Sequence, residues 1–232
     1  MHPIICKLGP FSIYSYGLML AIAFLLSVSL AKVQAKKEQI DPEVIFNLSF
    51  FSFLCGIIGA RIFYIVENIG YYLGEPLEIF MLQHGGLSWF GGLIGGFIFW
   101  TAYLKKKRLP LYKTLDLIAP FLALAQAIGR IGCLLNGCCF GKPYLLIPAQ
   151  LLSSLALLVI FIILRLLQER PHRGGEVFFT YLLLYSLKRL SIEFYRADNP
   201  PVIYGLNLFQ LLSLLALFLG LVKLILIKRK KY

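Results

Sequence analysis

Seven long apolar runs dominate this sequence and restrict the folds that are open to it. A helix needs about 20 predominantly apolar residues to cross the hydrocarbon core of a bilayer. With polar clusters taken as their ends, the runs predict seven transmembrane helices, near 11–31, 44–66, 86–104, 114–135, 145–166, 175–195 and 206–227. Because these helices use most of the 232 residues, we expect an all-α integral membrane protein with a single polytopic domain, 1–232.

The composition agrees with a membrane fold and argues against nucleic acid as a partner. Hydrophobic residues make up 59% of the chain and charged residues only 15%, whereas a soluble domain has about 45–50% and 25%. The net charge of +12 would suit nucleic acid in a soluble protein, but no basic stripe interleaved with exposed aromatics is present. The positive charges lie between the apolar runs instead, where they orient the chain and attract anionic lipid headgroups.

The distribution of Lys and Arg over the loops predicts the orientation of the chain. Three lie in 32–43, five in 105–113, three in 165–174 and four after 227, whereas the alternate side has only Lys7, Lys142 and Arg196. Because cytoplasmic loops carry the excess of Lys and Arg, we expect the N-terminus outside and the C-terminus in the cytosol.

Charged side chains inside the predicted helices indicate a polar interior site, because each is costly when it faces lipid. Besides the acidic Asp116 and Glu193, these helices contain Arg61, Arg130, Lys188, Arg189 and Lys223. Snorkelling from a helix end is the alternative, and it suits Lys223 best. Arg130 differs because glycines surround it in the segment 129–141. Glycines let a backbone approach a ligand closely and a planar guanidinium suits phosphate, so this segment predicts an anion pocket.

The sixth predicted helix carries three charges along one face. Arg189, Glu193 and Arg196 are spaced i, i+4, i+7, so that Glu193 can pair with either arginine. One arginine is then neutralised while the other is available for an anion. An ion-pair clamp between helices is the alternative interpretation of the same pattern.

Glycine, proline and polar aromatic residues give two of the helices an unusual character. The third run has repeated Gly pairs in 84–96, and the fourth continues through Pro120 into 129–132, so both are expected to be close-packed or broken around a cavity.

Tyr16 lies near the outer end of the first helix and His84 in the loop before the third. An interfacial aromatic belt and a solvated loop are the alternatives for these two side chains.

Several short motifs follow one another along most of the chain. They are 8–19, 59–64 (Gly-Ala-Arg-Ile-Phe-Tyr), 85–95, 116–120, 129–132 (Gly-Arg-Ile-Gly) with Asn136, Gly137 and Gly141, then 148–150 and 189–196. In this order they resemble the prolipoprotein diacylglyceryl transferases of bacterial inner membranes. Any single Gly-rich match is weak, but the ordered series is specific.

The resemblance implies a fold, a reaction and a set of site residues. The fold has seven helices with the N-terminus outside, and no metal or soluble cofactor takes part. Diacylglycerol moves from phosphatidylglycerol to the lipobox cysteine thiol of a lipoprotein precursor, with release of glycerol 1-phosphate. Arg130 and Arg189 can stabilise the charge that develops on the phosphate. We expect catalytic roles for Arg130, Arg189, Tyr16, His84, Cys138 and Cys139, and substrate-binding roles for Arg61, Asn136, Gly141, Glu193 and Arg196.

The chain departs from the family's usual pattern where the acceptor thiol would be handled. Phe90 stands at the usual histidine before the second Gly-Gly of the third helix. Cys133 and Cys138 replace an asparagine and a glutamate of the signature, while Leu152 and Ser153 replace a tyrosine and a glutamate. The phosphate-handling half of the site is retained, and the half that would deprotonate and orient a thiol is altered.

Three other functions stay open at this point. A paralogue with the same phospholipid site can use another acceptor, or Cys138 or Cys139 as a nucleophile. Cys133, Cys138 and Cys139 also suit a thiol-redox or metal-handling membrane protein, although their spacing is no standard zinc or thioredoxin-type motif. Buried packing is the simplest interpretation of the same cysteines. Anion transporters also have broken helices and intramembrane arginines, but many of them show an internal repeat that this sequence lacks.

Overall fold

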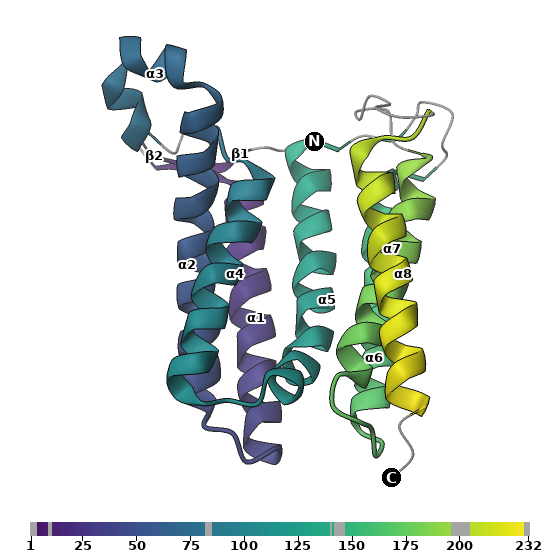
Figure 1. Ribbon diagram of the computed structural model, residues 1–232. Coiled ribbons are helices and arrows are strands. Elements are labelled where there is room, and N and C mark those ends of the chain that lie inside the picture. Colours follow the sequence, from purple (N-terminus) through teal and green to yellow (C-terminus); the bar gives the residue numbers. More distant parts are fainter. Residues whose placement is uncertain are drawn as a thin grey trace. The chain divides into compact units, whose positions relative to one another are not determined.

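The computed structural model describes residues 4–8, 11–81, 85–139, 141, 147–195 and 205–229. These residues form two compact units, one made of Met1–Gln34 with Tyr112–Tyr232 and the other of Ala35–Leu111. Figure 1 labels their helices and strands. Each unit is described by itself.

The described residues of the larger unit form helices and one short hairpin. Strands β1 (Ile4–Leu8) and β2 (Phe11–Tyr14) pair antiparallel. The helices that follow are α1 (Ser15–Lys37), α5 (Leu111–Asn136), α6 (Ala149–Gln168), α7 (Glu176–Glu193) and α8 (Leu208–Arg229), of which α1 and α5 each reach slightly beyond the unit at one end. Figure 1 shows α6, α7 and α8 side by side.

Two long helices and two short ones are formed by the described residues of the smaller unit. They are α2 (Pro42–Glu67), α3 (Ile69–Gly74), the 3-10 helix η1 (Pro76–Phe80) and α4 (Trp89–Lys107). The short pair lies between α2 and α4 in the sequence, where we expected only a loop.

Each of the seven apolar runs contains a helix, so the all-α prediction is confirmed. The predicted start of the first helix is wrong, because residues 11–14 form strand β2 and α1 begins at Ser15. Within the described residues, five helices are long and apolar enough to cross a membrane, namely α1, α2, α5, α6 and α8. The protein is therefore a multi-pass membrane protein. The other two long helices are less apolar, since α4 ends in three lysines and α7 carries Lys188 and Arg189 between two glutamates.

A buried apolar cluster joins α5, α6 and α7 in the larger unit. Small side chains on α5 face branched side chains on α6, and two residues of α7 complete the cluster. Its members are Ala119, Ala123, Ala127, Leu157, Ile160, Leu164, Val177 and Tyr181. Polar contacts join the same helices, because the Ser154 hydroxyl donates to the Ala127 carbonyl at 2.9 Å and the Tyr181 hydroxyl to Gln126 at 3.0 Å.

Pro120 does not break α5, and a neighbouring helix explains why it is tolerated. Proline has no N–H, so the carbonyl four residues earlier, that of Asp116, lacks its usual helical partner. The Gln168 side chain of α6 donates to this carbonyl at 3.0 Å and to that of Leu117 at 3.3 Å. Such replacement of a missing backbone bond is what an apolar surrounding requires.

The carboxylate of Asp116 ties α5 to the start of α7. Its two oxygens accept hydrogen bonds from the backbone N–H groups of Gly175 at 2.6 Å and Phe178 at 2.8 Å. These N–H groups belong to the first turn of α7, which has no partners of its own for them. Asp116 therefore acts as a helix cap supplied by a different helix.

Glycines allow α2 and α4 to pack with their backbones almost in contact. A Cβ added to Gly59 would lie 2.5 Å from the carbonyl oxygen of Gly91, and one added to Gly95 would lie 2.5 Å from that of Cys55. Because α4 runs unbroken from Trp89 to Lys107, its glycines bring about close packing and no break. Small residues have this role at many helix contacts in membranes.

Candidate functional site

The predicted site residues of the larger unit gather at one end of its helices. Because successive helices alternate in direction, α5 ends where α6 begins, and α7 ends where α8 begins. Figure 1 shows these four termini at the same end of the unit. The N-terminal end of α1 lies there too, since a Cβ added to Gly132 would be 3.0 Å from Met19 and 3.4 Å from the Tyr16 ring.

The turn that ends α5 brings three cysteines together. The backbone N–H groups of Gly137 and Cys138 both donate to the Cys133 carbonyl, at 3.0 and 3.1 Å. Gly137 has a φ of 76°, which lets the chain reverse directly after the helix. The three sulfur atoms, of Cys133, Cys138 and Cys139, consequently lie within 4.8 Å of one another, and all three residues are half-buried.

Two further contacts hold this turn in place. The Gln150 amide of α6 donates to the Cys138 carbonyl at 2.7 Å, and the side chains of Cys133 and Cys139 are hydrogen-bonded to each other. Cys139 itself has a φ of 61°, a left-handed conformation that costs a non-glycine residue about 1 kcal/mol. We call Cys133, Cys138 and Cys139 the cysteine cluster.

Arg130 lies one helical turn before Cys133 and is half-buried. It interacts electrostatically with both Cys133 and Tyr16, and Tyr16 also interacts with all three members of the cysteine cluster. Three of the predicted catalytic groups, Arg130, Tyr16 and the Cys138–Cys139 pair, are therefore brought together, although they come from α1, α5 and the turn after α5. Asn136 is the last residue of α5, and Gly141 follows shortly after it at the same end of the larger unit. Both residues are half-buried.

Arg189 and Glu193 form the ion pair that their spacing predicts. The Arg189 guanidinium lies 3.3 Å from the Glu193 carboxylate, whose side chain is fully buried, and it stacks over the Phe209 ring of α8 at 4.7 Å. Pairing of this kind is what makes a charge tolerable inside an apolar unit. The residue directly before Arg189 is Lys188, whose ammonium group donates to the Ser153 hydroxyl at 3.2 Å and lies 4.6 Å from the centroid of the Tyr185 ring.

Asn207 and Gln210 belong to this polar group, and the sequence analysis missed them. Each side chain accepts a 2.9 Å hydrogen bond from the other's backbone N–H, which forms a reciprocal cap at the start of α8. The Asn207 amide also donates to the Glu193 carboxylate at 3.1 Å. The spacing of a capping side chain and a glutamine three residues later was the available signal.

Arg61 belongs to the smaller unit and is only 7% exposed. Among the described residues, its guanidinium donates to the backbone carbonyls of Glu78, Ile79, Met81, Gly85 and Gly86. It also lies over the Tyr72 ring, 5.4 Å from the centroid. These contacts tie the segment between α3 and α4 to α2, so the geometry of Arg61 supports a positioning role beside the predicted role in substrate binding.

Two of the predicted site residues, His84 and Arg196, lie outside the described residues. Phe90, at the usual histidine position, is half-buried in the first turn of α4 and makes an edge contact with Trp89 at 5.2 Å between ring centroids.

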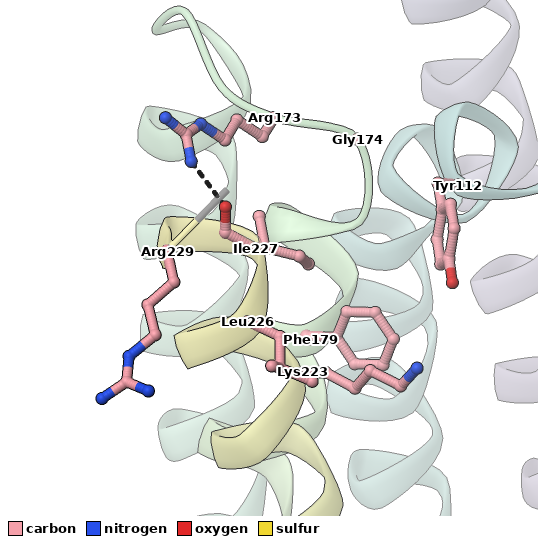
Figure 2. Close-up of a pocket in the computed structure, with 8 residues that line it drawn as sticks. All are labelled: Tyr112, Arg173, Gly174, Phe179, Lys223, Leu226, Ile227 and Arg229. Atoms are coloured by element: carbon pink, nitrogen blue, oxygen red, sulfur yellow. Dashed lines mark hydrogen bonds between the residues drawn. The ribbon is translucent and has the colours of Figure 1, made fainter. Parts of the chain in front are cut away.

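A cavity of about 530 Å³ lies at the opposite end of the larger unit. Figure 2 shows its lining, which comes from the start of α5, the loop before α7, Phe179 in the first turn of α7 and the last turns of α8. The Arg173 guanidinium donates to the Ile227 carbonyl at 2.5 Å and thereby caps the end of α8, while Lys223 extends into the cavity lining. None of the predicted catalytic residues lines this cavity.

Comparisons with known proteins identify the family of this chain. The family model of prolipoprotein diacylglyceryl transferase matches residues 3–226. Three similar proteins are named phosphatidylglycerol–prolipoprotein diacylglyceryl transferase. One from Clostridium tetani is 33% identical over 95% of both chains, one from Staphylococcus xylosus 32% identical over 100% of this chain and 91% of its own, and one from Streptococcus pyogenes serotype M5 34% identical over 100% and 97%.

A match over nearly the whole chain, with full-length relatives above 30% identity, settles the family. This chain belongs to the prolipoprotein diacylglyceryl transferase family.

Proposed function

We propose that this protein transfers diacylglycerol from phosphatidylglycerol to the thiol of a lipobox cysteine in a lipoprotein precursor and releases glycerol 1-phosphate. The observation that carries the proposal is the match over residues 3–226 to a family whose relatives are named for this donor and acceptor class. The protein works in the bacterial cytoplasmic (inner) membrane, where both the phospholipid and the precursor are available.

The proposed topology has seven transmembrane helices in one membrane domain. To the five helices that are apolar enough by themselves it adds α4 and α7, whose lengths of 19 and 18 residues approach the length of a span. With the Lys- and Arg-rich loops in the cytosol, the N-terminus and the cysteine cluster lie on the outer side. The basic cavity of Figure 2 then lies on the cytosolic side.

Arg130 and Arg189 are proposed to stabilise the leaving phosphate. Displacement at the glycerol carbon shifts charge onto the phosphate oxygens, and preorganised guanidinium groups stabilise that charge strongly in a low-dielectric surrounding. Glu193 and Asn207 restrict the Arg189 side chain, since both belong to its buried polar group. Arg130 is half-buried and close to Tyr16, so a headgroup can reach it.

The remaining predicted residues take supporting parts in the same proposal. Tyr16 and His84 are candidates for accepting the proton of the acceptor thiol. Asn136 and Gly141 contribute to the donor site near Arg130, and Arg196 is assigned a part in substrate binding from the sequence motif alone. Arg61 shapes the segment that leads into α4 through its bonds to backbone carbonyls.

A conditional strain depleted of its own prolipoprotein diacylglyceryl transferase tests the proposal. The wild-type chain is expected to restore growth and lipid-modified lipoproteins, whereas Arg130→Ala and Arg189→Ala are expected to fail at equal membrane levels. Lys223→Ala is the matched control, because it removes a basic side chain at the opposite end of the unit. Unmodified precursors in cells that contain the membrane-inserted wild-type chain would contradict the proposal.

A further inference from the structure

The cysteine cluster has the geometry of a thiophilic metal site. Its three sulfur atoms lie within 4.8 Å of one another. Three thiolates around one zinc ion, at Zn–S distances of about 2.3 Å, are separated by about 3.8 Å in tetrahedral geometry. Bringing the cluster to that spacing takes sulfur movements of about 1 Å, which side-chain rotation at the half-buried cysteines provides.

The local structure keeps these three donors together. Cys133 is fixed in the last turns of α5, and two backbone hydrogen bonds to its carbonyl fold the following residues back over it. Gln150 holds the Cys138 carbonyl from a different helix. A donor set that is held in place before the ion arrives loses less conformational entropy on binding than one that must be assembled.

The charges around the cluster suit a divalent cation. Three thiolates and one divalent ion carry a single net negative charge, which is costly inside an apolar surrounding. Arg130, which interacts electrostatically with Cys133, supplies the balancing positive charge. Thiolate ligands favour soft and borderline ions such as Zn²⁺ over Mg²⁺ or Ca²⁺.

Three protein ligands leave one position of a tetrahedral ion open. The segment that follows the cluster, 140–149, contains no His, Cys, Asp or Glu to fill it. Zinc sites with four protein ligands are structural, whereas those with three protein ligands bind water or substrate in the fourth position and are catalytic. A thiol that binds there is deprotonated by the ion.

We propose that Cys133, Cys138 and Cys139 bind a Zn²⁺-like cation whose open position takes the acceptor thiol and holds it as the thiolate. This inference rests on the proposed function for the identity of the acceptor. It explains how the chain activates a thiol with Phe90 at the usual histidine position: the ion, held next to Arg130, takes over the part that the proposed function gives to Tyr16 or His84.

The transfer step is balanced without any other reactant. The acceptor S–H proton is released to water when the sulfur binds the ion. The thiolate then attacks the glycerol carbon of the donor lipid, so that a C–S bond forms and the C–O bond to phosphate breaks. The electron pair of that bond goes to the phosphate oxygen, and glycerol 1-phosphate leaves beside Arg130 while the ion keeps its charge.

Cobalt(II) spectroscopy tests the metal site without any need for turnover. The double variant Cys6→Ser/Cys55→Ser leaves only the cluster cysteines, because the chain has five. Reduced and purified in detergent, this protein is expected to bind one Co²⁺ or Zn²⁺ per chain and to show thiolate-to-cobalt charge-transfer absorption. Each further Cys→Ser change in the cluster should weaken binding by more than the roughly 10–100-fold that loss of an outer-shell partner costs.

Addition of the acceptor tests the open position. A lipobox peptide with its cysteine should change the cobalt spectrum, whereas the same peptide with serine should leave it unchanged. Metal content below about a tenth of an ion per chain, or a disulfide within the cluster in protein purified without reductant, overturns the inference. An unchanged spectrum with the cysteine peptide overturns the role of the open position.

Parallel activity assays separate this inference from the proposed function. If the triple serine variant of the cluster forms thioether product at the wild-type rate, the transferase stands and the metal inference fails. If the cobalt protein binds the cysteine peptide but no lipid is transferred from phosphatidylglycerol, the metal site stands and the proposed function fails. Size-exclusion profiles of all variants exclude misfolding as the cause of a loss.

Discussion

The Gln150 side chain donates a 2.7 Å hydrogen bond to the backbone carbonyl of Cys138 and thereby joins the first turn of α6 to the turn that ends α5. Gln150 is only 3% exposed. The hydrogen bond links two motifs that are separate in the sequence, the segment after Arg130 and the residues 148–150. Gln150 therefore holds the backbone of the cysteine cluster at Cys138.

Replacement of Gln150 by leucine should loosen this turn. The change leaves the Cys138 carbonyl without its donor at nearly constant side-chain volume, which costs about 1 kcal/mol. We expect a lower midpoint of thermal unfolding in detergent and a loss of transferase activity larger than the loss of stability, because the cluster residues shift. Gln150→Glu, which keeps the length but not the amide donor, should behave like Gln150→Leu. Full activity in both variants would contradict a positioning role.

The Arg189–Glu193 pair should be more sensitive to single than to double replacement. Arg189→Met leaves the buried Glu193 carboxylate without its cation, and Glu193→Leu leaves the Arg189 guanidinium without its anion. Each change should lower the free energy of unfolding by about 3–5 kcal/mol. The double variant should unfold at a higher temperature than either single variant and still be inactive. Thermal unfolding and turnover measured on the same four proteins check this. Activity in the double variant would remove Arg189 from the catalytic group.

Arg189→Lys separates charge from geometry at the same position. Lysine retains the positive charge but lacks the planar fork that binds phosphate in two places. We expect near-normal folding with kcat lowered by about 10²–10³, the size of effect seen when one transition-state donor is removed. Steady-state kinetics with phosphatidylglycerol vesicles provide the measurement, and an unchanged kcat would assign Arg189 a purely structural role.

Arg61→Lys should affect the segment between α3 and α4 more than the rest of the smaller unit. Arg61 donates to carbonyls on both sides of 82–84, and a lysine ammonium cannot satisfy all of them at once. Hydrogen exchange of the amides in 76–88 is expected to become faster while that of mid-helix amides in α2 and α4 stays as in the wild type. Equal protection in both proteins would show that the arginine does not hold this segment.

The hydrogen bond from Gln168 to the Asp116 carbonyl, which lies four residues before Pro120, predicts a coupled pair of mutations. Gln168→Leu should destabilise the protein by about 1 kcal/mol, since the Asp116 carbonyl loses its donor. In a Pro120→Ala background the alanine N–H pairs with that carbonyl, so the same change should cost less. A double-mutant cycle of unfolding free energies measures the difference, and additive effects would contradict the coupling.

Much of the helical fold was predictable because each membrane helix is a long apolar run. The hairpin was not, because the strand residues 11–14 are as apolar as the helix that follows and extend the same run. The short elements α3 and η1 were not predicted either, because six and five residues are too few to show a periodic pattern.

The site was predictable in its residue types but not in its contacts. Arg130, Arg189 and Glu193 were indicated by the cost of charge in an apolar run. The i, i+4 spacing of Arg189 and Glu193 predicted that these two form a pair. The convergence of Cys133 with Cys138 and Cys139 depends on the positive φ of Gly137, and a sequence pattern does not fix that angle. The sequence identified Asp116 only as an acidic residue within a predicted helix, and the structure shows that its carboxylate accepts hydrogen bonds from the backbone of α7.

The proposed transfer reaction is tested most directly by mass spectrometry of a lipobox peptide after incubation with the purified protein and phosphatidylglycerol vesicles. We expect a peptide whose cysteine carries diacylglycerol in thioether linkage, together with an equal amount of glycerol 1-phosphate. A serine peptide should give neither product, and Arg130→Ala should abolish both. An unmodified cysteine peptide in the presence of folded, metal-loaded protein would contradict the transfer of diacylglycerol to the thiol.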